Sequence, residues 1–397
     1  MNLKIKKSKI SGSLQAIPSK SYAHRIAILN FFAKNEPTCD CGEFSSKDIE
    51  ATAKCLKDVL NGERVVDCGE SGSTLRFLLP CLAAVGGAFE FVCHGRLIDR
   101  PNDELFKVLN EHGIKIEKDK TIKIFGKLTS GEYQIRGDIS SQYISGLLMA
   151  LPNLDGESKI VLTTPLASSP YVDITLELLE KYGVLIEKTE YGFRIEGNQK
   201  FVGNEKPEGD YSNMAFFLVL GSLAGKVSVL GLNENSVQGD KKILEILKLA
   251  GAKIKEKNGV ITVKKSRLKG FTFSADTCPD LVPIACVLAS VSKGISKIYD
   301  VERLKIKESD RIESTLSMLK AFNVRAESDG KTITVYGGKI TGGKVNSFND
   351  HRIAMAGSVL GAVANGDTII LDSQAVNKSY PSFYKDFEKV GGVAIEI

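Results

Sequence analysis

The sequence predicts a mixed α/β protein of two domains, each built from three repeated units. Two recurring segments predict this architecture. One is a polar cluster followed by a long apolar helix, and the other is a helix end followed by two alternating, strand-like runs. The length of 397 residues also leaves room for two domains that each have a core.

The strand-pair segment ends a helical pattern with Gly or Asn and then alternates like two β-strands. Its markers Gly113, Gly183, Gly251 and Asn323 lie roughly 70 residues apart. Weaker copies occur at Asn61–Gly62 and in the C-terminal FEKVGGVAIEI. The clear copies are LNEHGIKIEKDKTIKIFG (109–126), LEKYGVLIEKTEYGFRIEG (179–197), LKLAGAKIKEKNGVITVKK (247–265) and LKAFNVRAESDGKTITVYG (319–337).

The helix segment opens with polar residues and continues as a helix that is apolar almost all round. Such a helix is expected to be buried, and its opening supplies N-cap residues. A short strand such as KVSVLGL or TIILDS follows many of the copies. The copies are IPSKSYAHRIAILNFFA, GESGSTLRFLLPCLAAVGG, GDISSQYISGLLMALPN, GDYSNMAFFLVLGSLAG, DTCPDLVPIACVLASVSKG and FNDHRIAMAGSVLGAVANG.

The repeats group as two domains joined by two crossings of the chain. The polar stretch NQKFVGNEKPEGD (198–210), with Pro207 and two glycines, is the best boundary. The first residues resemble a strand with no helix before it, so we expect them to complete the last domain. This predicts domains at 13–207 and at 1–12 plus 208–397, both with mixed sheets.

Composition excludes several classes of protein. A net charge of +5 and a pI near 8.6 are too weakly basic to indicate nucleic acid, but they suit small acidic ligands. The eight cysteines form no Cys-x-x-Cys pair, and Cys39 and Cys41 are too close for a zinc knuckle, so no metal is expected. The lysine-rich N-terminus and the absence of a long apolar run predict a cytoplasmic protein without a membrane partner.

Basic side chains gather at the helix openings and in nearby loops, where helix N-termini favour anions. Arg25, Arg76 and Arg352 adjoin apolar helix starts, and an unpaired buried cation there is costly. This arrangement predicts multiply charged anionic ligands such as phosphates and carboxylates. The basic residues in question are Lys20, Arg25, Arg76, Arg100, Lys307, Arg311, Arg352 and Lys378.

Nine motifs, in order along almost the whole chain, resemble those of the EPSP synthase family, the 3-phosphoshikimate 1-carboxyvinyltransferases. The combination of KESDR and NDHR with SKS and SSQ is highly specific. The resemblance implies two domains of three βαβαββ-type units with helices inside, an inside-out α/β barrel, and an active site in the cleft between the domains. The motifs are PSKSYAHR (18–25), GESGSTLR (69–76), DRPNDEL (99–105), GDISSQY (137–143), SSPYVDITL (168–176), CPDLVPIA (278–285), KIKESDRI (305–312), NDHRIAMA (349–356) and NKSYPSFY (377–384).

The resemblance also implies a reaction. The enolpyruvyl group of phosphoenolpyruvate passes to the 5-hydroxyl of shikimate 3-phosphate through a tetrahedral intermediate, and phosphate leaves. No cofactor is expected. The expected partners are these two small molecules alone, with the protein a monomer.

Site residues follow from the motifs position by position. Lys20 and Gln142 are implied to contact both substrates. Shikimate 3-phosphate is implied to contact Lys20, Ser21, Arg25, Ser140, Ser141, Gln142, Ser168, Asp280 and Lys307. Phosphoenolpyruvate is implied to contact Lys20, Gly72, Arg100, Gln142, Arg311, Arg352 and Lys378, where the arginine fork suits phosphate and carboxylate.

Catalysis needs groups that move protons. Asp280 is the candidate general base for the 5-hydroxyl, with helix capping as its structural alternative. Glu308 is the candidate for proton transfer at C3, with a salt-bridge role as the alternative, and Lys20 or Lys378 is able to share the proton shuttling. His24 is expected to be structural.

Some positions depart from the family pattern or have two readings. Glu70 and Arg303 stand where many relatives have Asn at a substrate contact, and Glu70 also suits a helix N-terminus. His351 either orients Arg352 or binds phosphate, and Tyr171 is expected to pack on the shikimate ring.

Two other functions fit the same scaffold. One is enolpyruvyl transfer to UDP-N-acetylglucosamine, whose enzymes usually carry a loop cysteine before the arginine that matches Arg100. That loop, GRLIDR (95–100), has none, and Cys93 falls in a strand-like run. The other is a non-catalytic anion-binding protein, which is expected to have lost Asp280, Glu308 or part of the arginine clamp.

Overall fold

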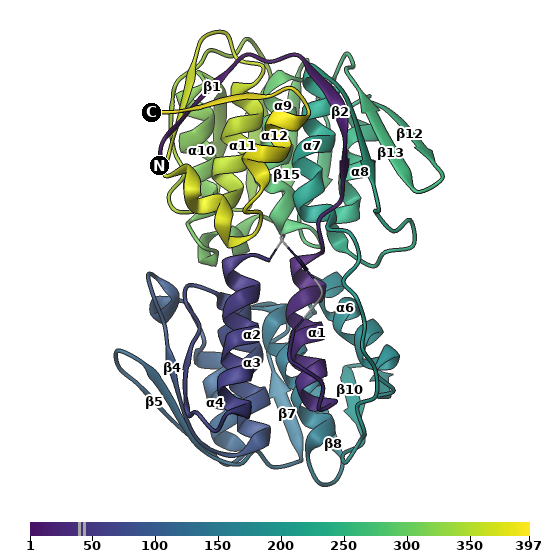
Figure 1. Cartoon of the computed structure of the whole chain (residues 1–397), viewed down its shortest axis with the longest axis vertical. Coiled ribbons are helices and arrows are strands. Elements are labelled where there is room, and N and C mark those ends of the chain that lie inside the picture. The colour runs from purple at the N-terminus through teal and green to yellow at the C-terminus, as the bar shows by residue number, and fades with distance from the viewer. Residues whose placement is uncertain (39–40, 43–44) are drawn as a thin grey trace. The chain divides into compact units, whose positions relative to one another are not determined.

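The computed structural model describes residues 1–38, 41–42 and 45–397 (Figure 1); Cys39 lies outside them. Its contacts divide the chain into residues 20–207, here called the inserted unit, and residues 1–19 with 208–397, here called the terminal unit. The later boundary lies within the polar stretch 198–210. The earlier one lies at Ser19 rather than near residue 12, because β2 (Ile10–Gln15) pairs along its whole length with β11 of the terminal unit.

One sheet topology recurs five times among the described residues. The first two strands are parallel, and the fourth strand lies antiparallel between the second and the third. Three of the sheets are formed by a continuous run of the chain with a β-α-β-α-β-β pattern, as the resemblance implied; the other two have the same pattern with β1 (Leu3–Lys6) or β2, from the start of the chain, as one of the strands. The two sheets of the inserted unit contain β3 (Val65–Asp67), β4 (Gly87–Val92), β5 (Ile114–Lys118) and β6 (Ile122–Gly126), and then β7 (Glu132–Ile135), β8 (Ser158–Leu162), β9 (Ile186–Thr189) and β10 (Gly192–Ile195).

The terminal unit holds the other three sheets, and the chain's first strands complete two of them. β1 (Leu3–Lys6) lies between β19 and β20, taking the position that a hairpin strand has elsewhere. The remaining strands are β11 (Gly225–Leu230), β12 (Lys253–Lys257), β13 (Val260–Lys264), β14 (Thr272–Ser274), β15 (Ile295–Tyr299), β16 (Arg325–Ser328), β17 (Thr332–Tyr336), β18 (Lys344–Asn346), β19 (Thr368–Leu371) and β20 (Val393–Glu396).

Of the six predicted units, the one that is first along the chain is incomplete among the described residues. It contributes α1 (Lys20–Phe32) and α2 (Lys47–Leu60), but no four-stranded sheet of its own is described there. After α2 the chain turns at Asn61 and Gly62 and enters β3, the first strand of the next sheet. The weaker strand-pair copy at Asn61–Gly62 therefore forms no hairpin.

The helices predicted to be buried form the cores of the units. Nearly every residue of these helices is buried, because their apolar residues occupy the whole circumference. Figure 1 shows α7, α9 and α11 side by side in the terminal unit, with the β12–β13 hairpin outside them. These helices are α1, α3 (Gly72–Val85), α5 (Ser141–Ala150), α7 (Tyr211–Ala224), α9 (Val282–Val291) and α11 (His351–Gly361).

The other helices connect successive strands and keep a solvent-exposed face. They are α2, α4 (Asp103–Glu111), α6 (Ser169–Lys181), α8 (Ile243–Leu249), α10 (Arg311–Ala321) and α12 (Phe383–Lys389). Among the described residues, none of the helices has the length and apolar character needed to cross a bilayer.

Polar side chains cap four of the buried helices at their openings. Ser71, Ser140, Asp210 and Asp350 each accept a hydrogen bond from an N–H group of the first helical turn. These bonds satisfy backbone donors that the helix itself leaves open. The predicted polar openings are therefore helix N-termini, and they bring the motif residues to helix starts.

Candidate active site

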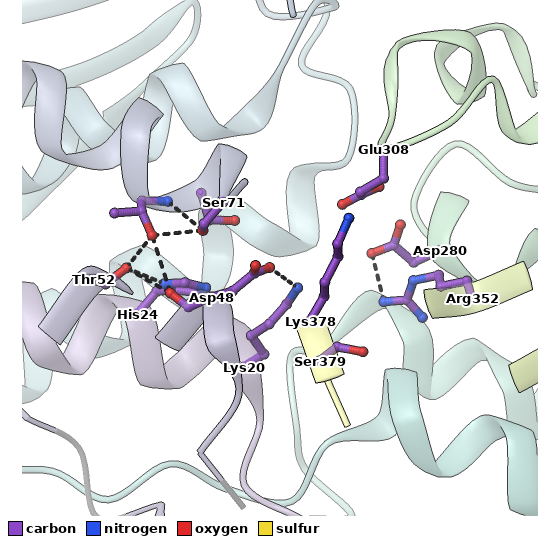
Figure 2. Close-up of polar contacts among 12 residues, drawn as sticks. Lys20, His24, Asp48, Thr52, Ser71, Asp280, Glu308, Arg352, Lys378 and Ser379 are labelled. Carbon is purple, nitrogen blue, oxygen red and sulfur yellow. Dashed lines mark hydrogen bonds and ion pairs between the residues drawn. The ribbon is translucent and has the colours of Figure 1, made fainter. Parts of the chain in front are cut away.

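The terminal unit gathers three cations around one carboxylate, that of Asp280. Arg311 Nη1 lies 2.6 Å from Asp280 Oδ1, and Arg352 Nη2 lies 3.0 Å from Oδ2 (Figure 2). Lys307 Nζ is 3.6 Å from Oδ1. Asp280 belongs to the short helix η5 (Pro279–Leu281) that leads into α9, while the arginines begin α10 and α11. Lys307 directly follows another short helix, Glu302–Ile306, so four separate segments bring these four predicted residues together.

The two arginines are fixed by a second carboxylate, Asp350, for which the sequence analysis gave no role. Asp350 is 0% exposed and caps α11 by accepting from the Arg352 backbone N–H at 2.9 Å. It also accepts from Arg311 Nε at 2.8 Å and from the Ser309 hydroxyl at 3.0 Å. Since Arg311 is 1% exposed, its charge depends on such neighbours.

The charges around Asp280 shift the ionisation of the cluster. Burial raises the pKa of Asp280, but Arg352, Lys307 and Arg311 outweigh it and hold that pKa well below the ordinary value. Burial lowers the pKa of Lys307 despite the nearby Asp280. Burial also opposes the charge of Arg311, yet Asp350 and two other carboxylates keep its pKa well above the ordinary value. At neutral pH Asp280 is therefore ionised.

Glu308 and Lys378 lie beside this cluster. Glu308 Oε2 accepts a hydrogen bond from Arg311 Nη2 at 2.5 Å. Glu308, predicted to transfer a proton, is therefore bound by Arg311, predicted to bind phosphoenolpyruvate. Lys378 ends the short helix η7 (Ser373–Lys378) and donates to the backbone oxygen of Asn349 at 2.9 Å. Figure 2 shows its side chain extending toward the carboxylate of Glu308.

Asp240 is a buried acid that the sequence analysis missed. It lies on η4 (Gly239–Lys242), is 2% exposed and accepts from the Ser212 hydroxyl. Its Oδ1 has no hydrogen-bond partner among the described residues. Burial, reinforced by the negative charge of Asp280, raises the pKa of Asp240 to about 7. Nothing in the polar segment QGDKK indicates that its aspartate is buried.

Two further predicted residues, Arg303 and His351, lie close to the same elements. Arg303 Nη2 donates to the backbone oxygen of Asp276 at 2.7 Å and to its carboxylate at 2.8 Å. His351 is 1% exposed, and its charge contributes to lowering the pKa of Asp280. His351 is thus part of the electrostatic surroundings of the carboxylate.

In the inserted unit, the opening of α3 holds the guanidinium of Arg100. A Cβ on Gly72, the first residue of α3, would collide with Arg100 Nη1 and lie 2.9 Å from its Cζ. Arg100 Nε is buried without a hydrogen-bond partner among the described residues. Glu70 is exposed just before the Ser71 cap, and its carboxyl carbon lies 3.0 Å from the position of a Cβ on Gly95. The backbone at Gly72 therefore makes room for an arginine.

Arg25 is a buried cation held by neutral groups. It is 2% exposed and donates to Thr175 Oγ1 at 2.6 Å, Ser21 O at 2.7 Å and Tyr171 O at 2.8 Å. No carboxylate forms an ion pair with it among the described residues, and burial lowers its pKa to about 10. A charge desolvated in this way is stabilised by an anionic ligand.

Gln142 is held in one orientation at the opening of α5. Its Oε1 accepts from Arg76 Nη1 at 2.9 Å, and its Nε2 donates to Ser73 Oγ at 2.8 Å. Arg76 thus fixes a predicted ligand-binding amide. Ser140 caps α5 and Ser141 is its buried first residue, while the buried Ser168 precedes α6 with a φ of 53°, a left-handed conformation rare for serine.

Lys20, the first residue of α1, is paired with Asp48 of α2. Its Nζ lies 2.8 Å from Asp48 Oδ2, and both side chains are largely buried (Figure 2). Asp48 carries no signal of this pairing in the sequence, because an acid in the first turn of a helix is common and indicates only a helix start.

Both units thus present cations, hydroxyls and backbone N–H groups at helix starts, and the terminal unit adds carboxylates able to move protons. This combination defines a class of protein that binds multiply charged anions and performs acid–base chemistry on them.

Comparisons with known proteins identify the family. The family model described as EPSP synthase (3-phosphoshikimate 1-carboxyvinyltransferase) matches residues 57–387. Proteins named 3-phosphoshikimate 1-carboxyvinyltransferase are similar along almost their entire length: that of Clostridium novyi is 41% identical, covering 100% of this chain and 98% of that protein. That of Clostridium kluyveri is 38% identical, covering 98% and 97%.

Solved structures share the fold at lower identity. The EPSP synthase of Acinetobacter baumannii aligns with a TM-score of 0.80 and 23% identity over 100% of both chains. The enolpyruvyl transferase NikO of Streptomyces tendae aligns with a TM-score of 0.76 and 15% identity, covering 99% of this chain and 98% of that one. On the family model and the full-length relatives, this chain belongs to the EPSP synthase family.

Proposed function

We propose that this protein transfers the enolpyruvyl group of phosphoenolpyruvate to the 5-hydroxyl of shikimate 3-phosphate and releases phosphate. The cluster of Asp280 with Lys307, Arg311 and Arg352 carries the proposal, because it joins an anion clamp to a carboxylate in a chain of this family. UDP-N-acetylglucosamine is not the favoured acceptor, since the full-length relatives are named for the shikimate reaction.

The substrates engage groups of both units in this proposal. Shikimate 3-phosphate is bound by the hydroxyl-bearing helix starts of the inserted unit and by Arg25, whose buried charge favours an anion. Phosphoenolpyruvate is bound by the arginines, with Arg100 over Gly72 in one unit and Arg311 with Arg352 in the other. Lys20 and Gln142 contact both molecules.

Transfer proceeds by addition and elimination. The 5-oxygen bonds to C2 of phosphoenolpyruvate while C3 gains a proton, and loss of a C3 proton then expels phosphate. Glu308 is the group that transfers the proton at C3 of phosphoenolpyruvate. Its bond to Arg311 supports this role, because the clamp that holds the phosphoenolpyruvate also holds the acid.

Asp280 accepts the proton of the 5-hydroxyl only after its surroundings change. Its pKa is held well below the ordinary value by three cations, so it is a weak base in this arrangement. Anionic substrates that attract Arg311 and Arg352 weaken these interactions and raise the basicity of Asp280. Substrate binding thereby switches on the base.

The test follows phosphate release with matched acceptors. Phosphate is released from phosphoenolpyruvate with shikimate 3-phosphate and not with UDP-N-acetylglucosamine. Release with the nucleotide sugar alone would assign the sister reaction, and no release with either acceptor would refute the enzyme.

Location and assembly are part of the proposal. The described cysteines are all free thiols, which supports a reducing compartment such as the cytoplasm. We expect a monomer, and light scattering after size-exclusion chromatography measures its mass. A dimer mass would refute that expectation.

A further inference from the structure

The ion pair between Lys20 and Asp48 joins the starts of two helices. A cation at a helix N-terminus faces the positive end of the helix dipole, whereas a carboxylate is favoured there. Lys20 is the first residue of α1, and Asp48 lies in the first turn of α2. Since the two side chains are only 16% and 13% exposed, solvent screens their attraction weakly. Asp48 therefore offsets a charge that α1 by itself disfavours.

The backbone of Asp48 is anchored by a chain of hydroxyl groups. Its carbonyl oxygen lies 3.4 Å from Thr52 Oγ1 and 3.3 Å from Thr74 Oγ1, and these two hydroxyls are 2.6 Å apart. Thr74 Oγ1 also lies 2.7 Å from the side-chain oxygen of Ser71, the cap of α3. Thr52 lies 2.7 Å from Nδ1 of His24 on α1. Figure 2 shows this chain, which connects the starts of α1, α2 and α3.

His24 does not compete with Lys20 for the carboxylate. Burial, together with the charges of Lys20 and Arg25, holds the pKa of His24 well below its ordinary value, so the imidazole is neutral. Its hydrogen bond goes to Thr52 rather than to Asp48. The carboxylate of Asp48 is left for the ammonium of Lys20.

We propose that Asp48 is a positioning residue for the transfer reaction, which holds the ammonium of Lys20 where the substrates meet it. The inference rests on the proposed function, in which Lys20 contacts both substrates. Asp48 acts only through Lys20 and touches neither substrate. Contacts with α2 and α3 anchor the backbone of Asp48, and its carboxylate holds the ammonium of Lys20, so the ammonium is oriented before the substrates arrive.

A double-mutant cycle tests whether Asp48 acts through Lys20. Asp48→Asn keeps the size of the side chain and the anchored backbone carbonyl while removing the charge. It lowers kcat/KM by roughly 100-fold in the wild-type background, but by less than about 3-fold in the Lys20→Ala background. Equal losses in the two backgrounds would overturn the proposal. Asp58→Asn is the matched control, because Asp58 pairs with Lys54 on the same helix at the surface; it leaves kcat/KM unchanged.

A second measurement needs no turnover. Acetic anhydride at low concentration, followed by mass spectrometry of peptides, reports how readily each lysine reacts. Without its charge-assisted bond, Lys20 in Asp48→Asn is acetylated at least about 3-fold faster than in the wild-type protein or in Asp58→Asn. Equal rates would refute the positioning role even in an active enzyme. An inactive wild-type protein would instead refute the proposed function.

Discussion

Replacing Asp350 by Asn removes one negative charge from the buried surroundings of Arg311 and nearly preserves the side-chain volume. Asn also caps helices well, so the cap of α11 is kept. The ion pair between Asp350 Oδ2 and Arg311 Nε, 2.8 Å apart with both side chains almost fully buried, is lost. The substitution therefore isolates the charge from the cap.

The expected loss of stability follows from the remaining neighbours. Removing one partner of a buried ion pair costs about 3–5 kcal/mol. Asp280 and Glu308 still contact Arg311, so the low end, about 3 kcal/mol, applies here. For a unit of roughly 200 residues, this corresponds to a fall in Tm of about 6–12 °C.

Differential scanning calorimetry of the full chain measures this fall. Asp310→Asn is the matched control, because Asp310 caps α10 and forms no ion pair among the described residues; its Tm falls by less than about 4 °C. Equal shifts in the two variants would refute the reasoning, since they would mean that the charge of Asp350 contributes nothing to Arg311.

The further predictions concern four single substitutions in the site. Asp280→Asn lowers kcat by more than about 100-fold and changes phosphoenolpyruvate binding less. Arg352→Ala chiefly raises KM for phosphoenolpyruvate. Steady-state kinetics measure both effects, and the opposite pattern would contradict the roles given to the two residues. Gly72→Ala displaces the guanidinium of Arg100 and raises KM for phosphoenolpyruvate more than KM for shikimate 3-phosphate, so equal changes would contradict the packing seen at α3. Asp240 has a folded-state pKa raised to about 7, so its contribution to stability is present at low pH and is lost as pH rises from about 4 to 7. Asp240→Asn flattens this decline in thermal unfolding between pH 4 and pH 7, and an unchanged profile would contradict the raised pKa.

Local sequence signals predicted the elements of the fold well. The hairpins follow glycines at the ends of helices, such as Gly113 and Gly251, which have positive φ angles of 91° and 84° that other residues rarely adopt. Pairing between strands that are far apart in the sequence was harder to predict. The run ISGSLQ has the pattern of a strand, but nothing in it indicates pairing with Gly225–Leu230. This pairing places the boundary between the units at Ser19 instead of near residue 12.

Most of the predicted site residues are cations or hydroxyls in distinctive motifs, and several of them, such as Lys20, Ser141 and Arg311, lie at helix starts. The missed residues lack such a signal. Asp48 lies 28 residues from its partner Lys20. Asp350 belongs to the motif NDHR, but the motif does not indicate that this side chain is 0% exposed. Burial and distant pairing decide the roles of these carboxylates, and both depend on tertiary structure.

The position of β1 imposes an order on biosynthesis. Its residue Leu3 pairs with Ile370 and Glu396, so this strand has no partner until almost the whole chain exists. At ribosomal rates of about 5–20 residues per second, the wait is roughly 20–70 s. Residues 20–207 form their own unit and are complete long before that, so they are able to fold while the N-terminal strand is still unpaired. A ribosome that stops between residues 207 and 368 thus releases a chain with one finished unit and an unpaired N-terminal strand, a substrate for chaperones or proteases.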